Sequence, residues 1–250
     1  MKEPRRHHYI PQFILRNFCQ EKSGRLFFYS AEDKTITQKE PKEVFMARDL
    51  YRDEINNPED RMKIERGFSV FEGEIAEIIR NRFLCEPEIV ISQYEEEMIR
   101  IFFALMGFRS LNTSQSFGEN APAANKEFYS LYQKNKNLDD FWKRNLGQLV
   151  NCRSLSAILE NPTIDEPGKL FMCRDIWGYT GRYISLVECP DSCEFIIGNA
   201  YPLNITGYRP NGPASEMYSF FPLSPKRVYF GLAPAIFRIF HFLALLCWLD

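Results

Sequence analysis

Apolar residues recur with a helical period through the middle of the chain. Within residues 61–83 they are spaced by about 3.6 positions, as on one face of an α-helix, at Ile64, Phe68, Phe71, Ile75 and Ile78. A second helix is predicted after Ser92, because Glu95 three residues later completes a capping box. It reaches Arg109, and its apolar stripe consists of Met98, Phe102, Leu105 and Met106. Two more helices are expected at residues 123–133 and 138–159.

Segments typical of β-strands flank these helices. Near the N-terminus, Pro11 opens a short helix, and residues 26–29 and 35–37 flank a polar turn, which predicts a β-hairpin. Residues 44–51 are predicted to form a loop and a short strand. After residue 162, glycine and proline separate short aromatic and β-branched segments, as between antiparallel strands, at 170–176, 182–187, 194–197 and 219–221. We therefore predict an α+β fold, with a central helical bundle flanked by an N-terminal β-hairpin and C-terminal antiparallel strands.

The last residues of the sequence have a different character. Residues 236–249 are apolar except for Arg238 and His241. The stretch is too short to span a bilayer, which takes about 20 residues. Three interpretations stay open: a buried terminal helix, an interfacial anchor, and an aberrant tail from a truncated or frameshifted gene. We predict a single domain over residues 1–232, followed by an apolar tail at 233–250.

Composition and charge indicate a globular protein but do not identify its function. The chain has 250 residues, of which 45% are hydrophobic and 26% charged, enough to build a full core. The formal net charge of -2 and the pI of about 6.0 give no global basic excess for nucleic-acid phosphates. A nucleic-acid role would need a local patch, and the one basic run near the start, Arg5-Arg6-His7-His8, is short. The sequence leaves partners and oligomeric state open.

Cysteine usage indicates a reducing compartment. The seven cysteines show no paired spacing, and no signal peptide precedes the first apolar run. We expect a cytoplasmic protein without a transmembrane span, with its cysteines acting as small core hydrophobes.

Three groups of residues could carry chemistry. His7 and His8 point to opposite sides of whatever element holds them, so one of the two is expected in a site, as a metal ligand or general base. In the alternative interpretation neither histidine has a chemical role: His7 is exposed and His8 packs on Tyr9. Glu65 and Glu72 lie seven residues apart and therefore share a helix face, where they could hold a divalent cation or form a solvated flank.

Arg109 falls within the apolar stripe of its helix. Because an arginine cannot lose its charge, it needs a carboxylate partner there, and Glu65 and Glu72 are the natural candidates. Such a pair is either structural or part of an anion site, since the guanidinium fork matches phosphate and carboxylate. Further along, residues 195–202 are predicted to form a buried strand that ends at Gly198 and Asn199.

The opening His7-His8-Tyr9-Ile10-Pro11-Gln12-Phe13-Ile14-Leu15-Arg16-Asn17-Phe18 resembles that of a bacterial family, domain-of-unknown-function family 4238, whose members begin H-x-x-P-x-x-x-L-R-x-F. The similarity continues to about Pro225. Family members tend to carry an aspartate where this chain has Asn199, which implies an impaired site if that aspartate binds metal or acts as a base. The resemblance implies no settled activity, but it implies that five residues converge: His8, Gln12, Glu65, Glu72 and Arg109.

Two functions from different classes follow. The first is a metal-assisted hydrolase of phosphate esters, such as a nuclease, in which Glu65, Glu72 and His8 hold Mg²⁺ or Mn²⁺ and Arg109 steadies the phosphate. The second is a non-catalytic binding module, in which Arg109, the two glutamates and His8 form a buried structural network. The first is slightly preferred here.

Overall fold

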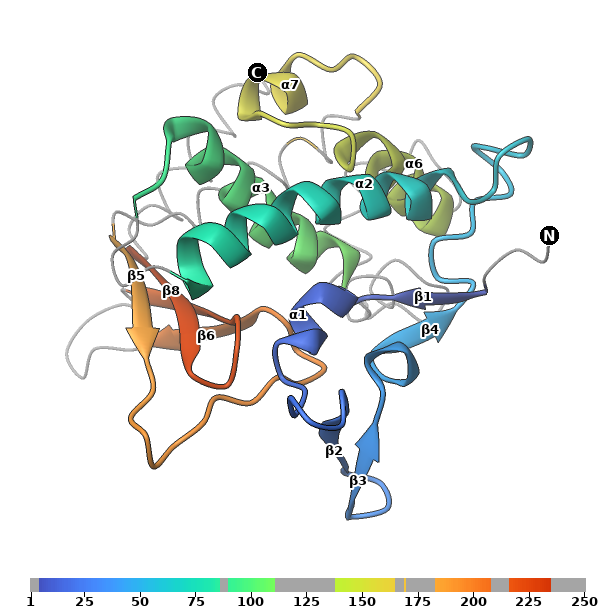
Figure 1. Ribbon diagram of the computed structural model, residues 1–250. Coiled ribbons are helices and arrows are strands. Elements are labelled where there is room, and N and C mark those ends of the chain that lie inside the picture. Colours follow the sequence, from blue (N-terminus) through green and yellow to red (C-terminus); the bar gives the residue numbers. More distant parts are fainter. Residues whose placement is uncertain are drawn as a thin grey trace.

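The computed structural model contains helices at the centre of the molecule and strands on either side (Figure 1). The structure describes residues 5–85, 90–110, 138–164, 169, 183–207 and 216–234. Predicted elements at 123–133 and 170–176, and most of the apolar tail at 233–250, lie outside these residues. The α+β fold predicted from the sequence is confirmed.

Two small antiparallel sheets form the N-terminal part. Strand β1 (Arg6–His8) pairs with β4 (Met46–Arg48), and the short helix α1 (Gln12–Arg16) follows β1 directly. The predicted hairpin is confirmed as β2 (Leu26–Ser30) and β3 (Thr35–Lys39). A single 3-10 turn, η1 (Pro41–Glu43), joins the hairpin to β4, and Tyr9 N–H donates to the Phe45 carbonyl (3.1 Å), which extends the contact between the two N-terminal segments.

The helical bundle matches the predicted periodicity closely. Helix α2 (Lys63–Ile78) buries the predicted apolar face and continues as the π-helix η2 (Ile79–Leu84). Helix α3 (Gln93–Arg109) begins with the predicted capping box, because Ser92 Oγ accepts from Glu95 N–H and Glu95 Oε2 accepts from Ser92 N–H. The helix predicted over 138–159 is wrong as one element: α6 (Leu138–Leu149) ends, and α7 (Leu155–Leu159) starts afresh.

The reason for that break lies in the sequence between the two helices. The Ser154 side chain accepts from Ala157 N–H (3.0 Å) and thereby caps a new helix. Helix α6 packs on α2 at two glycines: a Cβ on Gly67 of α2 would lie 2.6 Å from Cγ1 of Val150, the residue after α6, and one on Gly147 of α6 would lie 3.4 Å from Ile64 Cγ1. The small residues thus set how closely α2 and α6 approach.

Helix α3 is buried on nearly all sides rather than along one stripe. Its buried residues extend well beyond the predicted stripe and comprise Met98, Ile99, Ile101, Phe102, Phe103, Ala104, Leu105, Met106, Phe108 and Arg109. A helix that is apolar all round is the central element of a core. Consistent with this, α3 contacts α2 and α6, and its Phe103 reaches the C-terminal sheet.

The C-terminal part is a four-stranded antiparallel sheet in the order β5-β8-β7-β6. The strands predicted at 182–187 and 219–221 are confirmed as parts of β5 and β7, and the strands are β5 (Tyr183–Glu188), β6 (Leu203–Gly207), β7 (Glu216–Pro222) and β8 (Arg227–Pro234). The sheet packs on the bundle through Phe103, whose ring centroid lies 3.6 Å from that of Phe221 and 4.5 Å from that of Tyr229. Strand β8 runs past Leu232, the predicted end of the domain.

The strand predicted at 194–197 and the buried strand predicted over 195–202 are wrong. These residues form no regular element, and Ile196 is 86% exposed. Phe195 N–H donates to the Pro225 carbonyl (2.7 Å), so the segment runs along the sheet without joining its ladder. Its β-branched residues are typical of a strand, but Ile196 is at the surface and Ile197 packs only partly against the core.

The cysteines differ in burial, although all were predicted to be small core hydrophobes. Cys152 is buried, as expected of a small core hydrophobe, whereas Cys85 and Cys193 are exposed. All cysteines within the described residues are free thiols. In the same part of the chain, no helix is long and apolar enough to cross a membrane.

Candidate functional site

Strand β1 places its two histidines in different environments. His7 is fully buried, and its Nδ1 accepts the Tyr51 N–H at 2.8 Å. The His7 and Tyr51 rings stack with centroids 5.7 Å apart and an interplanar angle of 6°. The expectation of an exposed His7 is therefore wrong. Alternation along β1 sends the His7 side chain inward and leaves His8 half-buried.

Arg109, the last residue of α3, lies at the centre of a polar network. It is only 1% exposed. Its Nη1 donates to Glu72 Oε1 (2.5 Å), its Nε donates to the Tyr51 hydroxyl (3.2 Å), and its Nη2 donates to the His8 carbonyl. The guanidinium also lies over the Phe68 ring, with Cζ 3.7 Å from the ring centroid. One side chain thus joins β1, α2 and α3.

Tyr51 completes this network from the opposite side. Its hydroxyl donates to the Arg109 carbonyl (2.9 Å) while accepting from Arg109 Nε. Burial raises the pKa of Tyr51 to about 12, so the hydroxyl keeps its proton and can play both parts at once. The Arg109 carbonyl is one of the terminal carbonyls of α3, which have no partner within the helix. Tyr51 therefore caps α3 as well as holding the arginine.

Glu65 is the unusual carboxyl of the group. Its Oε2 is buried without a hydrogen-bond partner. Burial raises the pKa of Glu65 to about 7, with Arg109 lowering it and Glu72 raising it to smaller extents. Glu65 consequently titrates near neutral pH, in the range that acid–base chemistry uses.

His8 and Gln12 lie at the edge of the network. Gln12 Nε2 lies 3.4 Å from His8 Nδ1, and Gln12 Oε1 accepts from Arg16 Nη2 (3.5 Å). Burial lowers the pKa of His8, the Pro41 and Lys42 carbonyls raise it, and Arg109 lowers it. Of the five predicted site residues, only His8 contacts Gln12, so Gln12 joins the group through the histidine.

The residues predicted from the sequence therefore differ in how directly they contact one another. Arg109 bonds Glu72 and the main chain of His8, whereas Glu65 lies near the guanidinium without a bond to it. Tyr51 was not among the predicted residues, and His8 was assigned to the site although His7 makes the more buried contacts. The alternation of side chains along a strand was the signal that only one of the two histidines faces inward.

The donor set was also tested for a metal ion. Among the described residues, no group of three or more His, Cys, Asp and Glu side chains is placed to hold one. Glu72 Oε1 is committed to Arg109, and burial, which raises the pKa of Glu65 to about 7, disfavours the ionised form that a metal ion would need. The three expected ligands thus do not form a ready-made site. Asn199 Oδ1 accepts a hydrogen bond from the hydroxyl of Tyr9, the residue after His8 (3.0 Å).

Fold and site together define an α+β protein in which a buried arginine ties an N-terminal strand to a helical bundle. The chain belongs to the family described as "Protein of unknown function (DUF4238)", whose model matches residues 6–239. The match covers nearly the whole chain and extends beyond Leu232. No curated protein and no solved structure matches it.

Proposed function

We propose that the protein is a non-catalytic binding module whose Arg109 network is structural. The observation that carries this proposal is that Arg109 is almost fully buried, and that its three nitrogens all donate to groups of the protein itself. An arginine held in this way cannot reach a ligand. Its role is to fix β1, and with it the exposed N-terminal surface, against α2 and α3.

Because the network is buried, it is expected to contribute strongly to the stability of the fold. A charge removed from water is costly unless ion pairs and hydrogen bonds replace its hydration. Arg109 has Glu72, the Tyr51 hydroxyl and the His8 carbonyl for this purpose, and the Phe68 ring beneath it. Removing the guanidinium would leave the Glu72 carboxylate and the His8 carbonyl without this partner.

The test is Arg109→Leu, compared with Arg66→Leu. We expect Arg109→Leu to lower the free energy of unfolding by about 3–5 kcal/mol, the cost of breaking a buried pair. Arg66 pairs with Asp60 at the surface, so its replacement should cost less than about 1 kcal/mol. Urea denaturation followed by circular dichroism measures both. Equal small losses in the two variants would refute the structural role.

A second candidate is the metal-assisted hydrolase of phosphate esters, and Glu65 is the observation that favours it. Its buried, unpartnered oxygen and its pKa of about 7 suit a general acid or base. Glu72 lies on the same helix face, and for this reaction Glu65, Glu72 and His8 would have to leave their described positions to hold Mg²⁺ or Mn²⁺ together. Bound there, the ion would supply Lewis-acid activation of water.

Calorimetry with MgCl₂ and MnCl₂ distinguishes the two candidates. If the protein is a hydrolase, the wild type binds one of these ions saturably, and Glu72→Gln abolishes both the binding and phosphodiesterase activity without unfolding. Glu74→Gln is the matched control, because Glu74 is on the same helix and also pairs with an arginine, Arg153. A wild type that takes up neither ion rules out the metal-assisted reaction and leaves the binding module.

A further inference from the structure

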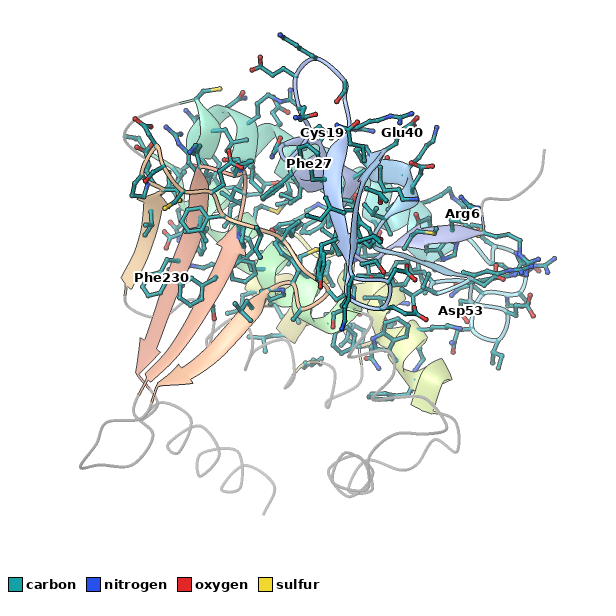
Figure 2. All side chains as sticks on the ribbon, turned by 90° about the horizontal axis from the view of Figure 1, so that it is seen from below. Arg6, Cys19, Phe27, Glu40, Asp53 and Phe230 are labelled. Atoms are coloured by element: carbon teal, nitrogen blue, oxygen red, sulfur yellow. The ribbon has the colours of Figure 1, made fainter. Side chains whose placement is uncertain are left out.

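Arginines from separate parts of the sequence gather at one side of the molecule. Arg5 and Arg6 lie at the start of β1, Arg48 ends β4, and Arg61 precedes α2. The side chains of Arg5, Arg48 and Arg61 are 54%, 71% and 44% exposed, and Arg6 is exposed too. Figure 2 shows Arg6 on the side of the molecule away from Phe230 of the C-terminal sheet. We call these four residues the arginine surface.

The pairing of β1 with β4 brings two of these charges together. Arg6 and Arg48 are direct partners in the antiparallel register, so their side chains leave the sheet on the same face. Like charges directly opposite each other destabilise a strand pair. Within the described part of the chain, no ion pair offsets the charge of Arg6. The molecule thus holds an unfavourable arrangement that an external anion would relieve.

The neighbouring carboxylates are shared between arginines. Asp49 accepts both the Nε and Nη2 groups of Arg5 and also lies 3.5 Å from Arg48 Nε. Glu54 pairs with Arg52 (2.9 Å) and with Arg61 (3.4 Å). In each case one carboxylate therefore serves two guanidinium groups.

We propose that the arginine surface binds the phosphate groups of nucleic acid. The guanidinium fork matches phosphate geometry, and all four residues of this surface carry it. Four guanidinium groups carried on separate segments suit a polymer with repeated phosphates better than one small anion. Such contacts position a backbone without reading its sequence. This inference names the partner of the proposed binding module and rests on that function to this extent.

The test uses Arg6→Gln/Arg48→Gln and a charge-matched control, Lys22→Gln/Arg80→Gln, in which both residues are exposed and lie outside the surface. Fluorescence anisotropy follows binding of a short labelled DNA duplex and of the same strand alone, between about 50 mM and about 200 mM salt. We expect the wild type to bind with a steep salt dependence. The double variant should bind about tenfold or more weakly, and its log–log salt slope should fall by about two. The control should match the wild type.

Three results would overturn the proposal: no binding by the wild type at low salt, an equal loss in the control, or binding to vesicles of anionic phospholipid without binding to either oligonucleotide. Circular dichroism of the double variant should be unchanged, because both side chains are at the surface. Failure of the structural role is seen separately, since unfolding of Arg109→Leu is measured without nucleic acid.

Discussion

Glu65 and Glu72 are the same residue type on one face of α2, yet their hydrogen bonding differs. Arg109 binds Glu72 directly, whereas Glu65 has a buried oxygen without a partner. Arg109 makes its hydrogen bond to Glu72 only, and burial raises the pKa of Glu65 to about 7. The difference between them is a property of geometry, since the sequence places both at equivalent helical positions.

This difference predicts a pH dependence of stability. The pKa of Glu65 is about 7 in the folded protein, against an ordinary value near 4.5 that the unfolded chain should show. Between these values the folded state binds the proton that the unfolded state has lost, so stability falls as pH rises and levels off above about 7. We expect a loss on the order of 2 kcal/mol from Glu65 between pH 5 and pH 8. Urea unfolding across this range measures it.

Glu65→Gln is the control for this titration, because an amide imitates the protonated acid at every pH. The variant should match the wild type at pH 5 and be more stable than it at pH 8. The charged groups facing Glu65 are Arg109 and Glu72, and both stay in place. Parallel curves for the two proteins would show that Glu65 does not titrate in this range.

The candidate site was only partly predictable from single residues. A helical wheel places Arg109 in an apolar stripe and so requires a carboxylate partner, which the structure supplies as Glu72. From the sequence, His7 and His8 are equally good candidates for the inward-facing histidine, because only the pairing of β1 with β4 decides which one faces Tyr51. His7 and Tyr51 are 44 residues apart, so no local sequence pattern predicts their contact.

Among the elements, helices were predicted more faithfully than strands. The period of α2 and the capping box of α3 are local patterns, and both appear in the structure. The break between α6 and α7 depends on one cap, Ser154, in an otherwise helical stretch. A strand needs a partner strand, which its own residues do not specify: β6 and β8 were not predicted although both pair with β7, and the segment 194–197 has strand-like residues but joins no ladder.

The close approach of α2 to α6 can be tested with two glycines of α2. Alanine normally stabilises a helix interior by about 1 kcal/mol over glycine. At Gly67 the new methyl would lie 2.6 Å from Val150 Cγ1, and a buried, β-branched valine cannot move aside easily. We expect Gly67→Ala to lower the free energy of unfolding by about 1 kcal/mol, because overpacking outweighs the helical gain.

Gly73→Ala serves as the matched control on the same helix. Nothing lies within 4 Å of a Cβ at Gly73, so this variant should be more stable than the wild type by about 0.5–1 kcal/mol. Thermal denaturation compares the three proteins. Stabilisation by both substitutions would mean that α6 does not pack on α2 as described.

Over the whole molecule, distant segments are joined by a few specific contacts. Asn17 Nδ2 donates to the Leu223 carbonyl (2.8 Å), and Arg227 Nη1 donates to the Phe83 carbonyl (2.7 Å). The Phe103 ring lies against Phe221 and Tyr229 of the sheet. These links predict that the bundle and the C-terminal sheet unfold together, as one cooperative unit.

Phe103→Ala tests this coupling. Removing a buried ring from the junction should cost about 3–5 kcal/mol, and Phe27→Ala, at an exposed position of the hairpin, should cost far less. Because α3 and the sheet share the Phe103 contact, amide hydrogen exchange in Phe103→Ala should speed up in α3, β7 and β8 by the same factor. Loss of protection confined to the sheet would instead show that the strands form a unit separate from the helices, and the single domain expected from the sequence would then be wrong.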